Sequence, residues 1–363
     1  MIKYIYQYPE WPHFRWDDKL IAAVFGEVRH LQGKLSGQMN ALGFSLQKEA
    51  SLNTLTLDVL KSSEIEGEKL NHDQVRSSIA RRLGMDVAGL VPADRDVEGV
   101  VEMMLDATQN CRQALTEDRL FGWHSALFPA GRSGMYKIDV GRYRTGEMQV
   151  VSGAMGKERV HYEAPAPEFV EREMNVFLNW VNNDVQTDAV LKGVIAHLWF
   201  VVIHPFDDGN GRIARAISDL LLARADGSSQ RFYSMSSQIL VERKRYYEVL
   251  QKVQHSSGDI TEWMEWFLHC LKHALLETET ALQAILYKAE FWKIHSDTSL
   301  NNRQRLVLNK LLDGFEGKLK TSKWAKIAKC SQDTALRDIQ DLIDKGILKK
   351  EEAGGRSTNY ELQ

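Results

Sequence analysis

A short polar run between two apolar stretches constrains this chain more than any other feature. The run covers residues 204–215 and reads His-Pro-Phe-Asp-Asp-Gly-Asn-Gly-Arg-Ile-Ala-Arg. Residues 194–203 before it are almost entirely apolar, and residues 213–222 after it have apolar side chains at helical spacing. We therefore predict two core helices joined by a polar turn, with the second helix beginning at the turn itself.

The turn carries groups that suit a phosphate. Gly209 and Gly211 have no Cβ, so the backbone can come close to a ligand. Together with Asn210, they would offer free N–H groups at a helix N-terminus, where the helix dipole favours an anion. Arg212 and Arg215 are three residues apart, so they share a helix face and can bind further phosphates.

Three other side chains of the run have expected roles in the same turn. His204 is the group of the run that can take a proton near neutral pH. Asp208 precedes the glycines, where its carboxylate suits Mg²⁺ held between phosphate oxygens. We expect Phe206 to face inward and stabilise the turn. A plain polar helix cap explains the run less well, because a cap needs neither His204 nor both arginines.

The run is similar to the signature of the Fic family, His-x-Phe-x-Asp/Glu-Gly-Asn-Gly-Arg-x-x-Arg, at every fixed position. Relatives in the Doc branch usually carry Lys in place of Gly211 and act as kinases. The resemblance therefore implies transfer of AMP from ATP to a Ser, Thr or Tyr hydroxyl of a protein, with Mg²⁺ as cofactor. It implies that His204 is the catalytic base, that Asp208 holds the metal, and that the nucleotide is bound by Gly209, Asn210, Gly211, Arg212 and Arg215.

A second motif lies far upstream, at residues 62–67. Ser62 and Glu66 are four residues apart and so share a helix face, and Gly67 is a natural helix end. The segment resembles the inhibitory motif of the Fic family, Ser/Thr-x-x-x-Glu-Gly/Asn, in its N-terminal class. That resemblance implies that Glu66 pairs with Arg215, which otherwise holds the γ-phosphate, so that ATP enters misplaced. An ordinary helix end with a solvated Glu is the alternative.

A change from helical to strand-like pattern marks residues 141–167. Residues 147–152 and 158–162 are β-prone and flank Gly153-Ala154-Met155-Gly156, which predicts a hairpin. Fic proteins carry such a hairpin as a flap on which a target segment pairs as an extra strand, and this resemblance makes Gln149, Val150, Val151 and Ser152 the docking strand. A plain surface hairpin is the alternative.

Helical periodicity dominates the rest of the chain. Helices are expected near residues 17–31 with Leu20, Val24, Val28 and Leu31 inward, around 52–59, 75–83, 100–111 and 168–181, and over 259–289; residues 90–99 suggest a linker. His197 is expected to pack in the core, and His124 is expected to be a hydrogen-bonded core residue rather than a ligand. We predict a mainly α-helical fold with an N-terminal region (1–95), a Fic core (96–295) and a C-terminal domain (300–363).

The tail resembles a winged helix-turn-helix. Three helices are expected around 306–312, 323–329 and 332–345, the last capped by Ser331, followed by strands at 347–352 and 358–362 around Gly354-Gly355. Leu336, Ile339, Leu342 and Ile343 are the expected core face of the third helix. Its expected exposed face carries Asp333, Arg337, Asp338, Asp341 and Asp344, which suits DNA phosphates poorly. We favour a protein-binding or dimer-forming module over DNA binding.

Bulk composition excludes several classes. A net charge of −3 over 363 residues predicts neither a nucleic-acid coat nor a membrane-surface protein. Three widely spaced cysteines form no disulfide or zinc pattern, and the start does not resemble a signal peptide, so we expect a cytoplasmic protein. Its expected partners are ATP, a protein target and, as an option, a second copy of the chain.

Two rival functions stay open from the sequence. One is a nucleotide-sensing regulator whose tail binds DNA. The other keeps the same site but removes AMP from a target, or transfers another nucleotide.

Overall fold

The computed structural model describes residues 3–41, 44–85, 90–152, 159–312, 317–351 and 358–363. The chain forms two compact units, Met1–Thr278 and Glu279–Gln363. The first unit contains both the 1–95 region and most of the 96–295 region, and the three-part division expected above stays a prediction.

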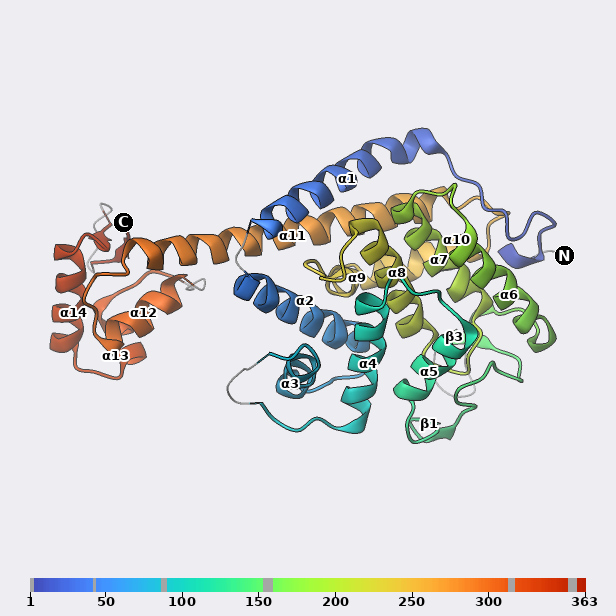
Figure 1. The fold of residues 1–363 in the computed structure, drawn as a ribbon, viewed down its shortest axis with the longest axis horizontal. Coiled ribbons are helices and arrows are strands. Elements are labelled where there is room, and N and C mark those ends of the chain that lie inside the picture. Colours follow the sequence, from blue (N-terminus) through green and yellow to red (C-terminus); the bar gives the residue numbers. More distant parts are fainter. Residues whose placement is uncertain (1–2, 42–43, 86–89, 153–158, 313–316, 352–357) are drawn as a thin grey trace. The chain divides into compact units, whose positions relative to one another are not determined.

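The first unit is built mainly from helices (Figure 1). After the 3₁₀ turn η1 (Ile5–Gln7), they are, in chain order, α1 (Asp18–Asn40), α2 (Phe44–Ile65), α3 (His72–Arg82), α4 (Arg95–Gln109), α5 (Glu117–Leu127), α6 (Pro167–Asn183), α7 (Ala189–Ile203), α8 (Asn210–Asp226), α9 (Met235–Val241), α10 (Arg243–Gln254) and α11 (Thr261–Ile294). The last part of α11 belongs to the second unit. No described helix combines the length and apolar character needed to cross a membrane.

The predicted pair of core helices is confirmed as α7 and α8. Every residue of α7 from Val190 to Ile203 is buried, because a helix that is apolar all round finds its stable place only in the interior. α8 packs directly against it and is buried from Arg212 to Ala223. α7 therefore delivers His204 to a turn enclosed by the core.

The helices of the N-terminal region follow the expected periodicity with two corrections. Asp17 caps α1 by accepting a hydrogen bond from the Lys19 N–H, but Leu20 is 57% exposed and Ile21 takes the inward position. The expected linker at 90–99 is wrong at its end, because α4 already begins at Arg95. Gly99 lies inside α4, where a Cβ would meet the Ala126 carbonyl oxygen at 1.7 Å, so glycine here permits close packing of α4 on α5.

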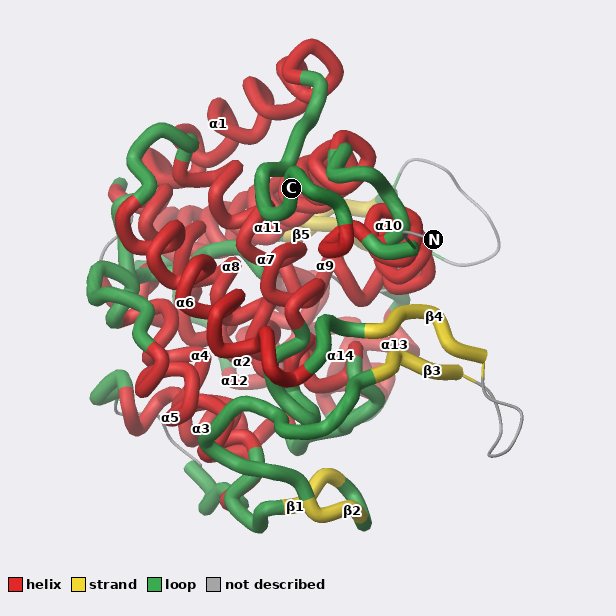
Figure 2. Tube along the Cα trace, turned by 90° about the vertical axis from the view of Figure 1, so that its right-hand side faces the viewer, coloured by secondary structure: helices red, strands yellow, loops and turns green. Residues whose placement is uncertain are grey.

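Two small hairpins extend from the helical body of this unit (Figure 2). β1 (Arg132–Ser133) pairs with β2 (Tyr136–Lys137), and β3 (Gln149–Ser152) pairs with β4 (Arg159–Glu163), both antiparallel. The strands of the predicted hairpin are thus confirmed, while its turn lies outside the described residues. In its two-stranded sheet, β3 has β4 on one edge and no other described strand on the other.

The second unit has its own hydrophobic core. Three helices precede an antiparallel strand pair, in the order expected from the sequence: α12 (Asn302–Leu312), α13 (Thr321–Ala328), α14 (Gln332–Asp344), β5 (Leu348–Lys350) and β6 (Tyr360–Leu362). Trp324, Ile339 and Leu342 are fully buried in this core. Ser331 caps α14 by accepting the Thr334 N–H, as predicted.

Two assignments on α14 were wrong. Leu336, expected in the core, is 50% exposed, and Ala335 packs inward instead. Asp338, expected on the open face, is buried and accepts hydrogen bonds from Arg303 Nε (2.8 Å) and Nη2 (2.9 Å). Asp338 can be buried on the inward face of α14 because Arg303 supplies the opposite charge that a buried carboxylate requires.

Candidate active site

His204 lies at the C-terminal end of α7 in a left-handed backbone conformation. Its φ of 51° and ψ of 60° are uncommon for residues other than glycine, although His, Asn and Asp adopt them more often than most. Its Nδ1 lies 3.1 Å from the Val201 carbonyl oxygen, one turn back in α7. A carbonyl accepts only, so Nδ1 carries the proton and Nε2 is left with a lone pair.

The charge state of His204 follows from its surroundings. Burial lowers its pKa from 6.5 to about 4, and Arg144 acts in the same direction. The Val201 hydrogen bond and the carboxylates of Glu66 and Asp208 oppose this shift without cancelling it. The imidazole is therefore neutral at physiological pH and able to accept a proton at Nε2.

The turn after His204 is braced by side chains that the core holds in place. The Asn210 side chain accepts the Phe206 N–H (3.0 Å) and donates to the Phe206 carbonyl (2.8 Å). Phe206 is fully buried, as predicted, and stacks on His124 with ring centroids 4.2 Å apart. His124 Nε2 in turn lies 3.2 Å from the Asp208 carbonyl oxygen. His124 is thus a hydrogen-bonded core residue, as expected, but it also supports the turn.

The start of α8 presents unpaired backbone donors. Gly209 occupies the N-cap with φ 80°, and the first α8 bond runs from the Ile213 N–H to its carbonyl (3.0 Å). The N–H groups of Asn210, Gly211 and Arg212 therefore precede the first helical bond and have no acceptor within the helix. They lie at the positive end of the helix dipole, which attracts anions.

The structure brings the upstream motif onto this helix. Arg215 is 2% exposed; its Nε donates to Ser62 Oγ (2.9 Å), and its Nη2 donates to the Ser62 carbonyl (2.9 Å) and to Glu66 Oε1 (2.8 Å). Gly67 adopts φ 87° just beyond the end of α2 and turns the chain there. Ser62 and Glu66 are four residues apart and both bind the guanidinium of Arg215.

A second carboxylate of the same segment binds the other arginine, and sequence reasoning missed it. Glu68 Oε2 lies 2.6 Å from Nη1 of Arg212, which is 3% exposed and sits over the Phe128 ring at 5.1 Å. No helical spacing links Glu68 to Glu66, because α2 ends at Ile65 and both residues lie beyond it. The charge of Glu68 close to the motif was the only sequence signal.

Some donor capacity at this site remains unused. Arg212 Nε and Arg215 Nη1 are buried without a hydrogen-bond partner among the described residues. Buried unpaired donors are costly in a folded protein and call for an acceptor. A triphosphate supplies such acceptors. At Gly211, a Cβ would meet Glu66 Oε1 at 2.2 Å and Arg215 Nη1 at 3.3 Å, so glycine leaves the space that Glu66 fills.

Asp208 has the chemistry of a magnesium ligand. It is half-buried beside the N-terminus of α8; its Oδ1 accepts the Gly209 N–H (2.5 Å), and its Oδ2 accepts a hydrogen bond from Ser133 Oγ of β1. Mg²⁺ prefers oxygen ligands and commonly uses one or two carboxylates together with substrate phosphates. The donor set therefore fits a cation held between Asp208 and a nucleotide.

The predicted docking strand lies apart from these groups. Val150 and Val151 of β3 are 37% and 47% exposed, and Gln149 donates to Glu163 on β4 (3.3 Å). No hydrogen bond described for these three residues reaches the 204–215 turn. Arg144, which sequence reasoning also missed, connects the hairpin to the 204–215 turn. Its side chain donates hydrogen bonds to backbone carbonyls of both.

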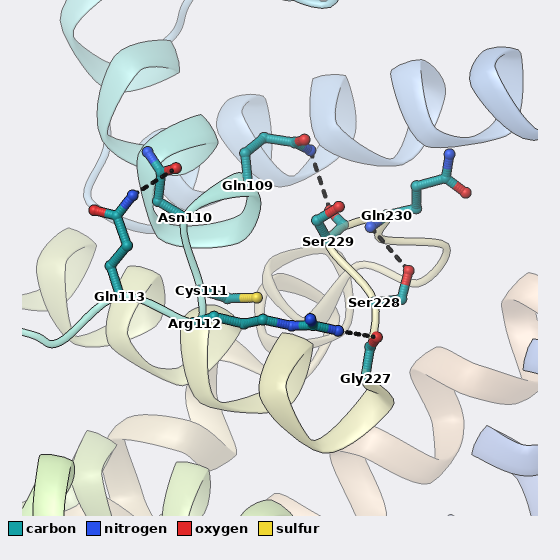
Figure 3. Close-up of a pocket in the computed structure, with 9 residues that line it drawn as sticks. All are labelled: Gln109, Asn110, Cys111, Arg112, Gln113, Gly227, Ser228, Ser229 and Gln230. Atoms are coloured by element: carbon teal, nitrogen blue, oxygen red, sulfur yellow. Dashed lines mark hydrogen bonds between the residues drawn. The ribbon is translucent and has the colours of Figure 1, made fainter.

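A separate cavity lies at the other end of α8 (Figure 3). Its volume is about 450 Å³, and Gln109, Arg112 and Gly227 are among its lining residues. Arg112 and Gln109 are already engaged there, by the carbonyls of Gly227 and Ser229. None of the predicted site residues lines this cavity, so it is distinct from the His204 turn.

Comparison with protein families assigns two segments of the chain. Residues 114–222 match the Fic/DOC family, and residues 4–85 match the domain of unknown function DUF4172. The first match contains His204, Arg215 and the β3–β4 hairpin. The second match covers the segment that carries Ser62 and Glu66.

The curated relatives of this chain are distant. It is 25% identical to the protein adenylyltransferase Fic of Nematostella vectensis over 224 residues, which is 60% of this chain and 47% of the relative. It is 31% identical to the protein adenylyltransferase fic-1 of Caenorhabditis elegans over 90 residues, 24% of this chain and 16% of the relative. The chain thus spans less than half the length of these relatives.

Solved structures share the fold. A Fic family protein from Desulfovibrio desulfuricans G20 superposes with a TM-score of 0.55 at 21% identity, covering 97% of this chain and 98% of that one. Fic-1 (residues 134–508) from C. elegans gives a TM-score of 0.50 at 21% identity, covering 73% and 74%. At this identity the likeness shows the fold alone.

Proposed function

We propose that this chain is a Fic-family enzyme that transfers AMP from ATP to a hydroxyl group of a protein, and that its own Glu66 restrains the reaction. The observation that carries the proposal is the start of α8. There, Arg212 Nε and Arg215 Nη1 are buried without a partner among the described residues, and the N–H groups of Asn210, Gly211 and Arg212 have no acceptor within the helix. The distant adenylyltransferase relatives support the same reaction class.

The chemistry follows from the protonation state of His204. Its Nε2 accepts the proton of the acceptor hydroxyl, because Nδ1 is committed to Val201. The hydroxyl oxygen then bonds to the α-phosphorus, the bond to the bridging oxygen breaks, and pyrophosphate leaves. Arg212 and the N–H groups of Asn210 and Gly211 stabilise the charge that grows on the phosphate oxygens. Mg²⁺, when bound at Asp208, supplies further neutralisation of that charge.

Restraint arises because the same arginines already have partners. Glu66 binds Arg215 and Glu68 binds Arg212, so a triphosphate competes with two carboxylates of one segment. As part of the same chain, this segment competes at an effective concentration of about a millimolar or more. Nucleotide that enters beside Glu66 would be displaced from its productive position, since like charges repel.

The docking strand and the second unit have proposed roles as well. The open edge of β3, from Gln149 to Ser152, is proposed to pair with an extended segment of the target through backbone hydrogen bonds. The second unit is proposed to be a winged-helix module that contacts protein. Its α14 exposes Asp333 and Asp344, and such acidic side chains would repel nucleic-acid phosphates.

Mass measurement on the intact protein tests the proposal. We expect Glu66→Gly to gain the mass of one or more adenylates after incubation with ATP and Mg²⁺, and to gain more than the wild type. The double variant Glu66→Gly/His204→Ala should gain none while still binding ATP. Transfer by that double variant would remove His204 from its role, and equal gains by wild type and Glu66→Gly would refute the restraint. Parallel incubations with CTP, GTP and UTP identify the donor.

A further inference from the structure

Arg144 is a buried cation with an unusual set of partners. It is 3% exposed, and no ion pair among the described residues includes it. Its three guanidinium nitrogens donate to backbone carbonyls: Nε to His204 (2.8 Å), Nη1 to Gly146 (2.8 Å) and Nη2 to Pro165 (2.5 Å). Burial lowers the pKa of Arg144, which reflects the cost of keeping this charge away from water.

The three carbonyls belong to two parts of the site that are far apart in sequence. Gly146 lies where the chain enters the β3–β4 hairpin, and Pro165 lies where it leaves. His204 is the residue whose imidazole faces the reaction. The backbone N–H of Arg144 also donates to the Pro205 carbonyl (2.9 Å). A single planar group therefore joins the base of the hairpin to the turn that holds the imidazole.

The hydrogen bond from Arg144 to His204 acts at a residue with a left-handed backbone. A residue with a side chain costs about 1–3 kcal/mol in a sparsely populated backbone region and stays there only when its surroundings hold it. Arg144 fixes the carbonyl of His204, and the Phe200 carbonyl fixes its N–H (2.9 Å). The Tyr162 hydroxyl on β4 donates a separate hydrogen bond to the Val202 carbonyl (2.7 Å). The hairpin therefore keeps one hydrogen bond to α7 when Arg144 is replaced.

We propose that Arg144 is a positioning residue that sets the distance between the open edge of β3 and the imidazole of His204. This inference rests on the proposed function, because β3 is the strand on which the acceptor segment would pair. All three guanidinium nitrogens of Arg144 donate to backbone carbonyls, so Arg144 acts through the backbone and not directly on the nucleotide. Lysine keeps the charge but has one nitrogen, so it cannot span the same three acceptors.

The test compares Glu66→Gly with Glu66→Gly/Arg144→Lys. Both are incubated with Mg²⁺ and α-labelled ATP, and the AMP linked to the protein is measured against the AMP released into water. We expect the protein-linked fraction to fall at least about tenfold, because misplacing a reactant by about 1 Å can cost about 10²-fold in rate. Calorimetric titration with MgATP should give the same Kd for both proteins. Hydrogen exchange in residues 149–152 and 159–163 should become faster.

A neighbouring arginine provides the control. Arg142 lies on the same segment, but its side chain is 63% exposed and pairs with Asp139. Arg142→Lys in the Glu66→Gly background should leave the protein-linked fraction and the hairpin exchange unchanged.

The possible outcomes separate the inference from the function on which it rests. An unchanged ratio of protein-linked AMP to released AMP in the Arg144→Lys protein would overturn the positioning role. A parallel loss of both products, or a loss of MgATP binding, would also overturn it, because Arg144 would then support the turn or the fold as a whole. No transfer by the Glu66→Gly parent would overturn the proposed function, and the inference would fall with it.

Discussion

At the scale of single residues, the chemistry of this site depends on where charges and protons are held. His204 combines a committed Nδ1, a free Nε2 and a pKa lowered to about 4. The surrounding motif predicted that His204 is a base. The lowering of its pKa could not be predicted, because it comes from burial in the folded chain. The same holds for His124, whose place under Asp208 comes from the packing of α5 against the turn.

The titration of His204 can be observed directly. In the nucleotide-free protein with labelled histidine, we expect its imidazole resonances to titrate near pH 4. Glu66→Gly should lower this midpoint further, since the Glu66 carboxylate now raises the pKa. Adding MgATP to Glu66→Gly should raise it, because phosphate charge favours the imidazolium. His204→Asn assigns the resonance by its loss, and a midpoint near 6.5 in the free protein would contradict the burial argument.

Among the elements, the C-terminal end of α2 and the start of α8 are held together by side-chain contacts. Ser62 and Glu66 meet Arg215 because helical spacing places both on one face, and this much was visible in the sequence. The contact between Glu68 and Arg212 was not, since it depends on how the chain turns after Gly67. Two ion pairs thus hold one segment over the proposed phosphate site.

Removing the charge of Glu68 should loosen this segment moderately. We expect Glu68→Gln to tighten MgATP binding by about two- to fivefold, because a half-exposed ion pair contributes only about 0.2–1 kcal/mol. The Glu68 side chain is 47% exposed and that of Glu66 is 31% exposed, so Glu66→Gly should have the larger effect. Titration calorimetry measures both. Glu64→Gln is the matched control, because Glu64 pairs with Lys61 and should not affect binding; an unchanged Kd for Glu68→Gln would show that its contact does not oppose nucleotide.

At the scale of the whole molecule, two compact units share the long helix α11. The first unit holds the site, and the second has a separate core around Trp324. The order of elements in the tail was predictable from periodicity and turn residues. The inward position of Asp338 was not, because its partner Arg303 lies on another helix.

Separate cores predict separate unfolding transitions. In differential scanning calorimetry of Glu66→Gly, we expect MgATP to raise the temperature of one transition and leave the other unchanged, since ligand stabilises only the unit that binds it. Trp324→Ala should lower the second transition by removing a large buried side chain. A single transition that shifts with both changes would mean that the units unfold together.

The polar turn, the periodic helices, the hairpin strands and the shared face of Ser62 and Glu66 were predictable from the amino-acid order alone. Each of these depends on residues at short, regular spacing, which helix and strand geometry converts directly into position. The meetings of buried groups became visible only in the folded chain: Arg144 with His204, Glu68 with Arg212, and His124 with Asp208. Such contacts join distant segments, and their partners are selected by packing and by the need to satisfy buried charge, for which no spacing rule exists.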